Sequence, residues 1–245
     1  MKESTLTRHL TISDKSALIL MADVHSNRVA LEAVLAETQA DDVLICAGDL
    51  TGYYTEPNEV CERLRELSVI CIKGNHDKYV LGELDYPASR EEKYRVLANR
   101  QALSVENRDW LAGLPDTATL VLTDKSGATN ADPVVVRVAH GSPRDVEEYV
   151  YPDTSIDFLT SDEPGFLVLG HTHHPMSRQA GALNVINPGS VGQVRDRKPG
   201  ASFASLLPFS GKLDFRRAAY DVGAYQHHLT QEGVHSSMVQ ILSRS

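Results

Sequence analysis

The side chains best suited to chemistry in this chain are His, Asp and Asn residues that directly follow short apolar runs. They fall in six places: Asp23 with His25, Asp49, Asn75 with His76, His140, His171 with His173, and Asn187. In an extended chain, side chains two residues apart point the same way, so each pair with one intervening residue can offer two ligands to one locus. Mixed imidazole and carboxylate ligands suit Zn, Fe, Mn, Co or Ni rather than Ca or Mg. Because there are more ligands than one ion needs, the pattern favours a pair of ions that share a carboxylate.

Each of these residues alone is more typical of a helix cap or a turn than of a metal ligand. The five places apart from Asn187 nevertheless put eight such residues at strand ends of one inferred sheet system. Capping does not readily explain so many. Asn187, in the run Asn187-Pro188-Gly189-Ser190, is by itself typical of a turn.

The elements that must position these residues alternate in the first part of the chain. Continuous apolar runs over 16–22, 43–47 and 69–72 predict strands that are buried on both faces. Helical spacing over 29–39, and over 57–67 after the helix-opening Pro57, predicts the intervening helices. This alternation predicts parallel pairing with right-handed crossovers, and ligands bind at the C-terminal ends of strands in such sheets.

Later segments read mostly as strands and turns. Ser89-Arg90-Glu91-Glu92 resembles a capping box and predicts a helix to about residue 104, before a second short helix that ends near Leu111. Strands are then predicted over 117–123, 134–139, 166–169, 182–186, 201–207 and 212–220, with a turn at 125–127 and a hairpin at 210–211. A helix with a loose end is predicted over 222–245, with surface histidines His227, His228 and His235. Because no repeat or linker is evident, we expect one domain over 1–245.

Composition narrows the function classes. The net charge of −9 argues against a nucleic-acid surface, so nucleic acid is an unlikely partner. The polar N-terminus lacks the apolar region of a signal peptide, and no run reaches the roughly 20 apolar residues that span a bilayer. We therefore expect a cytoplasmic protein with no membrane partner, while a homo-oligomer remains open. The three cysteines form no CxxC pair and are expected to be buried free thiols.

The order of the motifs resembles the calcineurin-like metallophosphoesterase superfamily over about residues 18–220. The matching motifs are Asp23-Val24-His25, Gly48-Asp49, Gly74-Asn75-His76-Asp77, His140-Gly141 and Gly170-His171-Thr172-His173. The runs 48–53, 57–60 and 187–192 are similar to its small prokaryotic phosphodiesterase-like branch. The resemblance implies an α/β fold, a four-layer αββα sandwich with two stacked mixed β-sheets flanked by helices.

The resemblance also assigns roles. One metal site would use Asp23, His25, Asp49 and His173, and the other Asp49, Asn75, His140 and His171. Two divalent or trivalent transition-metal ions (Mn, Fe, Zn, Ni or Co) about 3.5–4 Å apart would polarise the phosphoryl group and hold a hydroxide for in-line attack. His76 would protonate the leaving oxygen. The implied substrate is a small-molecule or nucleotide-like phosphoester, either a diester or a monoester.

Departures from the family pattern limit the assignment. Ser26 stands where many relatives have Gly, and it should be tolerated if the backbone does not need positive φ. Protein Ser/Thr phosphatases of the superfamily carry an Asp-Arg pair where this chain has Gly52-Tyr53. Asp77 could orient His76 in place of that pair, although a turn contact is the favoured interpretation. Gly74 is expected to give the turn its backbone freedom.

Further contacts and alternative functions remain open. Asn27 and Arg28, at a helix N-terminus, are candidate substrate-binding residues, and Arg144 is a weaker candidate for phosphate. Specificity is expected from the loops 52–56, 79–88 and 142–161. The alternatives are a non-catalytic scaffold on the same fold and, among enzymes, a dinucleoside polyphosphate hydrolase or a protein phosphatase. Because scaffold relatives lack some ligands or the motif His, the complete set here favours an enzyme.

Overall fold

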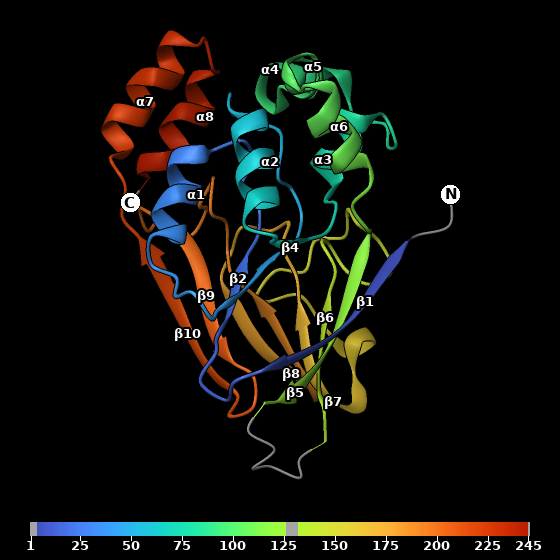
Figure 1. The fold of residues 1–245 in the computed structure, drawn as a ribbon. Coiled ribbons are helices and arrows are strands. Elements are labelled where there is room, and N and C mark those ends of the chain that lie inside the picture. The colour runs from blue at the N-terminus through green and yellow to red at the C-terminus, as the bar shows by residue number, and fades with distance from the viewer. Residues whose placement is uncertain (1–3, 126–131, 245) are drawn as a thin grey trace.

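Two five-stranded β-sheets form the centre of the computed structural model, which describes residues 4–125 and 132–244 (Figure 1). The first sheet consists, in spatial order, of β1 (Thr5–Ile12), β5 (Thr117–Asp124), β6 (Val134–Val138), β7 (Ser161–Val168) and β8 (Met176–Asn187). The second consists of β10 (Lys212–Ala218), β9 (Ala201–Leu207), β2 (Leu18–Met21), β3 (Val43–Cys46) and β4 (Ile70–Cys71). Each sheet contains both parallel and antiparallel pairs, so both are mixed.

Strand β2 shows why the apolar runs predict central strands. It pairs in parallel with β3, and β3 with β4, as the alternating pattern predicts. All four β2 residues are buried. Leu18 and Leu20 belong to the core between the two sheets, whereas Ile19 and Met21 face the core beneath the helices. Since strand side chains alternate between faces, a strand covered on both sides must be apolar throughout.

Helices cover the second sheet, and a shorter segment covers the first. The helices are α1 (Arg28–Leu35), α2 (Pro57–Glu66), α3 (Asn75–Leu81), α4 (Glu91–Tyr94), α5 (Val96–Ala102), α6 (Val105–Ala112), α7 (Val222–Gln231) and α8 (Ser236–Gln240). The apolar face of the first sheet away from the second packs against Val150, Ile156 and Leu159, and this region includes the 3₁₀ helix Asp157–Leu159. The layers confirm the predicted αββα sandwich.

Strand β1 is missing from the sequence-based prediction. Residues 5–12 contain three apolar side chains among three threonines, Arg8 and His9, and Arg8 interrupts the alternation of Leu6, Leu10 and Ile12, so the segment carries little hydrophobic signal. The strand exists because β5 supplies a complete parallel partner. Cross-strand hydroxyl pairs support it, with Oγ1–Oγ1 distances of 2.9 Å for Thr5 and Thr117 and 3.1 Å for Thr11 and Thr123.

Two helix predictions are wrong in detail. The helix predicted from Ser89 to about residue 104 is divided at Arg95, whose φ of 52° is left-handed. Ser89 lies in the 3₁₀ helix Ala88–Arg90 and does not cap α4; the carboxylate of Glu91 instead accepts from the backbone N–H of Leu97 at 3.0 Å. The C-terminal helix is likewise divided into α7 and α8 around Gly233, at φ 68°. Of the predicted 125–127 turn, residues 126 and 127 lie outside the described residues.

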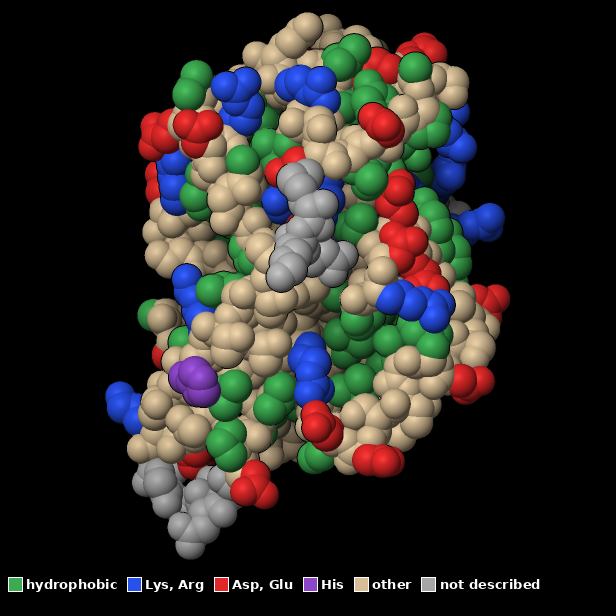
Figure 2. Space-filling model, turned by 90° about the vertical axis from the view of Figure 1, so that its right-hand side faces the viewer, with side chains coloured by type: hydrophobic (Ala, Val, Ile, Leu, Met, Phe, Trp, Pro, Cys, Tyr) green, Lys and Arg blue, Asp and Glu red, His purple; other side chains and the backbone are tan. Residues whose placement is uncertain are grey.

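Charged side chains of both signs lie on the surface (Figure 2). None of the helices in 4–125 and 132–244 combines the length and hydropathy required to cross a bilayer. On the face shown in Figure 2, basic side chains are scattered among acidic ones and form no continuous stripe.

Candidate metal centre

Strand ends and the loops after them hold five of the seven candidate ligands in an unusual backbone conformation. The non-glycine residues with positive φ include Asp23 (55°), His25 (50°), Ser26 (56°), Asp49 (54°), His171 (68°) and His173 (61°). Such conformations cost energy outside glycine and persist where the surroundings over-determine them, commonly at functional sites. Here the loops after β2 and β3 are joined by hydrogen bonds from the N–H groups of Asp23, His25 and Ser26 to the carbonyls of Gly48, Asp49 and Leu50, at 3.0, 2.9 and 2.8 Å.

This backbone conformation differs from the extended one expected for the pairs Asp23 with His25 and His171 with His173. The two pairs were expected to converge because an extended chain points alternate side chains the same way. The residues of both pairs are left-handed instead. Asp23 and His25 meet in one cluster, whereas His171 and His173 lie in different clusters, so the expectation of one shared locus is wrong for the second pair. Ser26 also takes a positive φ of 56°, contrary to the condition under which it was expected to replace Gly without strain.

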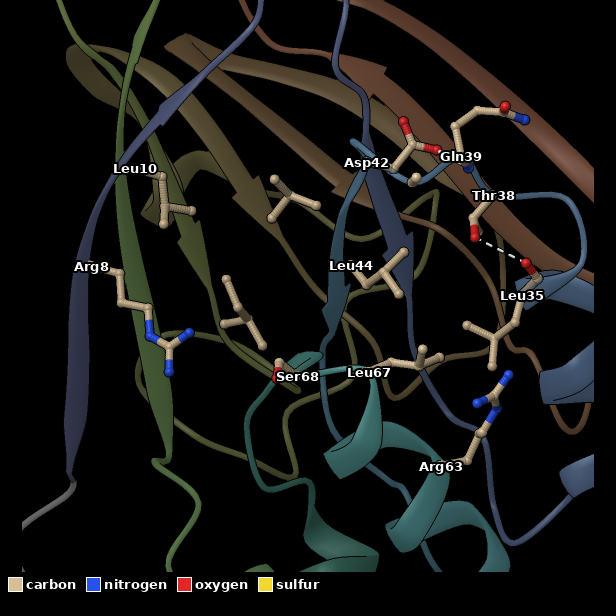
Figure 3. Close-up of a pocket in the computed structure, with 13 residues that line it drawn as sticks. Arg8, Leu10, Leu35, Thr38, Gln39, Asp42, Leu44, Arg63, Leu67 and Ser68 are labelled. Carbon is tan, nitrogen blue, oxygen red and sulfur yellow. Dashed lines mark hydrogen bonds between the residues drawn. The ribbon is translucent and has the colours of Figure 1, made fainter. Parts of the chain in front are cut away.

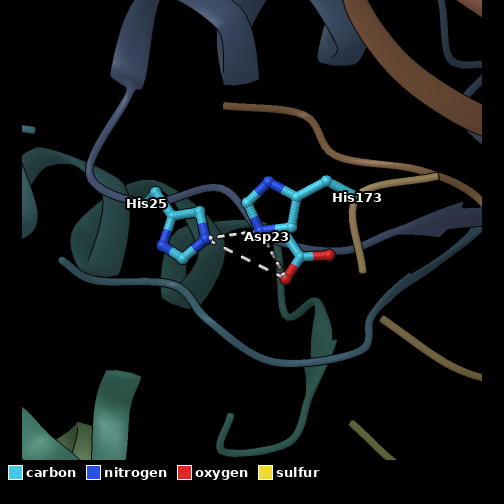
Figure 4. Close-up of side chains that lie close together, drawn as sticks. All are labelled: Asp23, His25 and His173. Carbon is cyan, nitrogen blue, oxygen red and sulfur yellow. Dashed lines mark hydrogen bonds and ion pairs between the residues drawn. The ribbon is translucent and has the colours of Figure 1, made fainter. Parts of the chain in front are cut away.

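The first cluster joins Asp23, His25 and His173 (Figure 4). The Nε2 atoms of the two histidines lie 3.1 Å apart, and Oδ1 of Asp23 lies 3.9 Å from His25 Nε2 and 3.5 Å from His173 Nε2. Each Nδ1 faces a backbone carbonyl: Thr51 O at 3.0 Å from His25 and Gln193 O at 2.6 Å from His173. A carbonyl only accepts, so Nδ1 must carry the hydrogen and Nε2 presents a lone pair in the neutral ring.

The two Nε2 lone pairs make the first cluster suitable for binding a cation. Burial lowers the pKa of His25 to about 4 and that of His173 well below its ordinary value, so both rings are neutral at pH 7. Two lone pairs facing each other cannot hydrogen-bond. Asp23 Oδ2 is also buried without a partner among the described residues. Metal–ligand bonds of about 2.0–2.2 Å place neighbouring ligand atoms about 3–3.6 Å apart. The distances of 3.1 and 3.5 Å fall in this range, and the 3.9 Å between Asp23 Oδ1 and His25 Nε2 is slightly longer.

The second cluster contains Asp49, His140 and His171, with Asn75 beside them. His140 donates Nδ1–H to the Ala47 carbonyl at 2.7 Å, and its Nε2 lies 3.0 Å from Asn75 Oδ1 and 3.3 Å from Asp49 Oδ2. His171 Nε2 is buried and has no hydrogen-bond partner in the described parts of the chain. Asp49 Oδ2 is also 3.6 Å from His25 Nε2 in the first cluster. Asp49 therefore lies between the two clusters, where a shared carboxylate is needed.

Charge in the second cluster is balanced by the ligands themselves. Burial favours the neutral form of His140, but the Asp49 carboxylate overcomes this and raises its pKa to about 10. Burial alone would raise the pKa of Asp49, yet His140 and His76 hold it below its usual range. A cation bound here would take the place of the His140 proton. The structure brings all seven predicted ligands into two adjoining clusters; that they bind metal stays a prediction.

His76 stands beside the clusters without belonging to either. Its backbone N–H donates to Asp49 Oδ1 at 2.8 Å, at the start of α3. Its ring contacts those of Tyr53 and Tyr94, with centroids 4.6 Å away in both cases. Its Nδ1 is buried with no partner among the described residues. A Cβ added to Gly52 would lie 2.5 Å from this nitrogen, so the glycine leaves no room for the acidic partner that the protein phosphatases carry.

Asp77 makes the turn contact favoured from sequence. Its carboxylate accepts from the backbone N–H groups of Gly74, Leu50 and Thr51 at 2.9, 3.2 and 3.0 Å, and from the Thr51 hydroxyl at 2.8 Å. It thus caps α3, which the sequence did not predict, and ties it to the loop after β3. Gly74 is required for space and not for a special φ, since a Cβ there would lie 2.1 Å from Asp49 Oδ1.

A pocket of about 190 Å³ opens over the clusters and His76. Its lining includes side chains from all three predicted specificity loops: Tyr53, Tyr79, Pro87, Glu147 and Tyr149. It also includes Arg195, which the sequence did not single out although it follows the 187–192 run by three residues. A larger cavity of about 500 Å³ lies elsewhere, between β1, β3 and the ends of α1 and α2 (Figure 3), and contains no histidine. Cavity size therefore does not locate the chemistry.

The three weaker candidates lie outside the pocket lining. Asn27 caps α1 through its Oδ1, which accepts from Ala30 N–H at 3.0 Å, and its Nδ2 donates to the Gly192 carbonyl at 3.0 Å. Arg28 lines an outer groove with acidic residues of α1 and α2. Arg144 pairs with Glu148 and stacks 3.8 Å from the Phe158 ring centroid.

Asn187 supports the loop that carries two of the ligands. Its Nδ2 donates to the Gly170 carbonyl at 2.6 Å and the Thr172 hydroxyl at 3.1 Å, and its Oδ1 accepts from Gly189 N–H at 2.9 Å. It forms a turn, as its surroundings in the sequence suggest, and it holds the 170–173 loop in place.

Asn99 holds the strained Ser26 loop in place, which gives a stability prediction. Its Oδ1 accepts from the Ser26 hydroxyl at 2.7 Å and from Gly52 N–H at 3.0 Å, while its Nδ2 donates to the Tyr54 carbonyl at 3.0 Å. Replacing Asn99 with Ala leaves these buried groups unpaired and should lower the free energy of unfolding by about 3 kcal/mol. Denaturant unfolding followed by circular dichroism measures this. Gln101→Ala, at an exposed position of the same helix, should change it by less than about 0.5 kcal/mol; equal effects would contradict the role of Asn99.

The chain is similar to known proteins over most of its length. Residues 17–207 match the family model of the calcineurin-like phosphoesterase superfamily domain. An uncharacterized protein of Methanocaldococcus jannaschii is 31% identical over 229 residues, which is 85% of this chain and 89% of that protein. The structure of a metallophosphoesterase from Sphaerobacter thermophilus is 29% identical, with a TM-score of 0.75 over 94% of this chain and 98% of that one. A hypothetical protein from Pyrococcus horikoshii shares the fold at 20% identity, with a TM-score of 0.76 and the same coverage.

The fold is the αββα sandwich of the phosphoesterases, and it carries two buried clusters of His and Asp that could bind metal. The chain belongs to the calcineurin-like phosphoesterase superfamily.

Proposed function

We propose that this protein hydrolyses small-molecule or nucleotide-like phosphoesters with two transition-metal ions. The first ion would be held by Asp23, His25, Asp49 and His173, and the second by Asp49, Asn75, His140 and His171. The observation that carries the proposal is that two buried clusters adjoin at Asp49 and open into one pocket beside His76. When bound, such a pair of ions polarises a phosphoryl group and activates water as the nucleophile.

The chain's own residues prepare the site for that reaction. Backbone carbonyls of Thr51, Ala47 and Gln193 fix the rings of His25, His140 and His173, so these three rings do not have to reorient when the ligands are used. The left-handed loops hold the carboxylates in place by several backbone hydrogen bonds. Preorganisation of this kind is what lets polar groups stabilise a transition state without a reorganisation cost.

His76 has the position to act on the leaving group. Burial lowers its pKa to about 3, so the ring is neutral in the empty pocket and can donate one N–H. An anionic phosphoester in the pocket favours the positive form. Either form can donate a hydrogen bond to the leaving oxygen, and the positive form can transfer a proton to it and become neutral. Because its Nδ1 is not engaged by another described residue, the ring is free for this role.

The alternatives are less consistent with the site. A non-catalytic scaffold does not need a complete set of ligands brought within a few ångströms, as the set is here. A dedicated protein phosphatase is disfavoured because Gly52 packs against His76 where those enzymes have an acidic residue. A dinucleoside polyphosphate hydrolase would use the same reaction and differ in how it holds additional phosphates.

The test is a metal-reconstituted assay. The purified protein is stripped with a chelator, reloaded separately with Mn, Fe, Zn, Ni or Co, and given bis(p-nitrophenyl) phosphate, p-nitrophenyl phosphate and a panel of nucleotides. We expect at least one metal to restore hydrolysis of a diester or monoester, and excess chelator to abolish it. If no metal produces chelator-sensitive hydrolysis of any compound, the enzyme proposal is overturned.

A further inference from the structure

Arg195 is a charged group of the pocket that the proposed reaction does not use. It lies on the loop between β8 and β9 and lines the pocket together with Asp49, His76 and both histidines of the 170–173 loop. Its Nη2 donates to Gln193 Oε1 at 2.9 Å and to the Tyr53 hydroxyl at 3.2 Å, and its Nε lies 3.3 Å from the same Gln193 oxygen. These partners are neutral, so they orient the guanidinium without neutralising its charge.

The two partners connect Arg195 to the metal clusters. The Gln193 carbonyl accepts from His173 Nδ1, and Gln193 itself is held by the Ser190 hydroxyl, which accepts from its backbone N–H at 2.7 Å. The Tyr53 ring packs against those of His25 and His76, with centroids 4.6 Å away in both cases. Arg195 is therefore placed by the same residues that place the candidate ligands.

A second cavity adjoins the pocket at Arg195. It measures about 390 Å³ and is lined by Arg195, Arg197, Ile241 and Arg244. Three of these four residues are arginines, and two elements far apart in sequence supply them, the β8–β9 loop and the C-terminal segment. The C-terminal segment is fixed against the site, because the Met238 carbonyl accepts from the Tyr54 hydroxyl at 3.1 Å.

The three guanidinium groups form no ion pair with a carboxylate in the part of the chain that the structure describes. Within residues 4–125 and 132–244, no ion pair joins Arg195, Arg197 or Arg244 to a carboxylate, whereas many other arginines are paired. The neighbouring Asp196 does not serve them, since its carboxylate pairs with Arg217. Cations gathered in one cavity repel each other, and an anion with several acceptor oxygens would relieve the repulsion. Guanidinium groups are particularly suited to phosphate, which they can bind through two parallel hydrogen bonds.

We infer that the cavity lined by Arg195, Arg197 and Arg244 binds a second phosphate of the substrate while the phosphoester occupies the metal pocket. The inference rests on the proposed function and narrows its substrate class to small molecules that carry at least two phosphate groups. Arg195, which lines both cavities, lies between the two phosphates. Arg197 and Arg244 are specificity residues for the second phosphate and contact no reacting atom.

Competition against a single-phosphate reporter tests this inference. The metal-loaded protein hydrolyses bis(p-nitrophenyl) phosphate in the presence of adenosine 5′-monophosphate, 5′-diphosphate, 5′-triphosphate or 3′,5′-bisphosphate, and the inhibition constants are compared. We expect at least one compound with two or more phosphates to inhibit at least about tenfold more strongly than the monophosphate, as one charge-assisted contact permits. In Arg197→Ala/Arg244→Ala this ratio should fall to near one. Arg108→Ala, an exposed position on α6, is the matched control and should keep it.

The design separates the inference from its alternatives. Metal chelation by the polyphosphates affects all variants alike, so a ratio that is the same in the double variant and the wild type overturns the inference. Stronger competition by a single-stranded oligonucleotide than by every mononucleotide also overturns it, because the second phosphate would then belong to a polymer. If the wild type hydrolyses no reporter, the proposed function fails, and calorimetric binding of the bisphosphate to wild type and double variant still tests the cavity.

Discussion

Replacing Asp49 with Ala should remove both metal ions and lower kcat/KM for a phosphodiester by at least about 10³-fold. Its Oδ2 lies 3.6 Å from His25 Nε2 and 3.3 Å from His140 Nε2, so it is the carboxylate that reaches both clusters. Without it, the second cluster has no anionic ligand to offset the charge of an ion. Metal content by mass spectrometry and kcat/KM for bis(p-nitrophenyl) phosphate measure the two effects.

Asp23→Ala is the matched comparison. The Asp23 carboxylate lies beside the ring nitrogens of His25 and His173, and it meets the second cluster through the backbone N–H of His171 at 3.0 Å rather than through a ligand atom. This variant should therefore keep close to one ion per chain while Asp49→Ala keeps none. Asp214→Ala, on the exposed part of β10, should keep both. Thermal unfolding of the stripped proteins shows whether the variants are folded, which matters because Asp49 Oδ1 also accepts from His76 N–H. Two ions retained in folded Asp49→Ala would refute the shared-carboxylate assignment.

The location of the site could be predicted because it depends on strand ends. Apolar runs mark β2, β3 and β4, and in a parallel arrangement their C-terminal ends must meet at one edge. Asp23 and Asp49 therefore had to lie near each other whatever the details of the loops. The backbone conformation could not be predicted in the same way. His and Asp show no preference strong enough to reveal a positive φ, and here the strain is held by hydrogen bonds between two loops remote in sequence.

The sequence did not predict helix α3 or the role of Arg195, and the reasons differ. Helix α3 has seven residues and begins directly at Asn75, so its polar first turn carries no apolar periodicity, and its cap comes from within the helix through Asp77. Arg195 is oriented by Tyr53, which lies far from it in the sequence, and it lines a cavity together with the C-terminal segment. A single arginine in a loop has no sequence pattern that indicates a cavity. Pairwise contacts across the chain, and not local propensity, decide both features.

His76→Ala should lower kcat for a phosphodiester with a poor leaving group by about 10²–10⁴-fold, the usual range for loss of general acid catalysis. The ring touches Tyr53, Tyr94 and His25, but its nitrogens bind none of the candidate ligands. Metal content should therefore stay near the wild-type value. Loss of metal in a folded His76→Ala variant would instead place the ring in the metal sites. Tyr94→Phe, which keeps the ring contact with His76, is the control and should change kcat little.

The leaving group distinguishes proton donation from simple positioning. A p-nitrophenolate leaves without a proton at neutral pH, whereas an alkoxide of high pKa cannot. If His76 donates the proton, the defect of His76→Ala should be large for an alkyl ester and at least about tenfold smaller for bis(p-nitrophenyl) phosphate. If the ring only holds the phosphate, the defect of His76→Ala should be equally large for both substrates. In the variant, kcat should therefore depend more steeply on the pKa of the leaving group. The reason is that the imidazole of His76 is no longer there to offset the charge that develops on the departing oxygen.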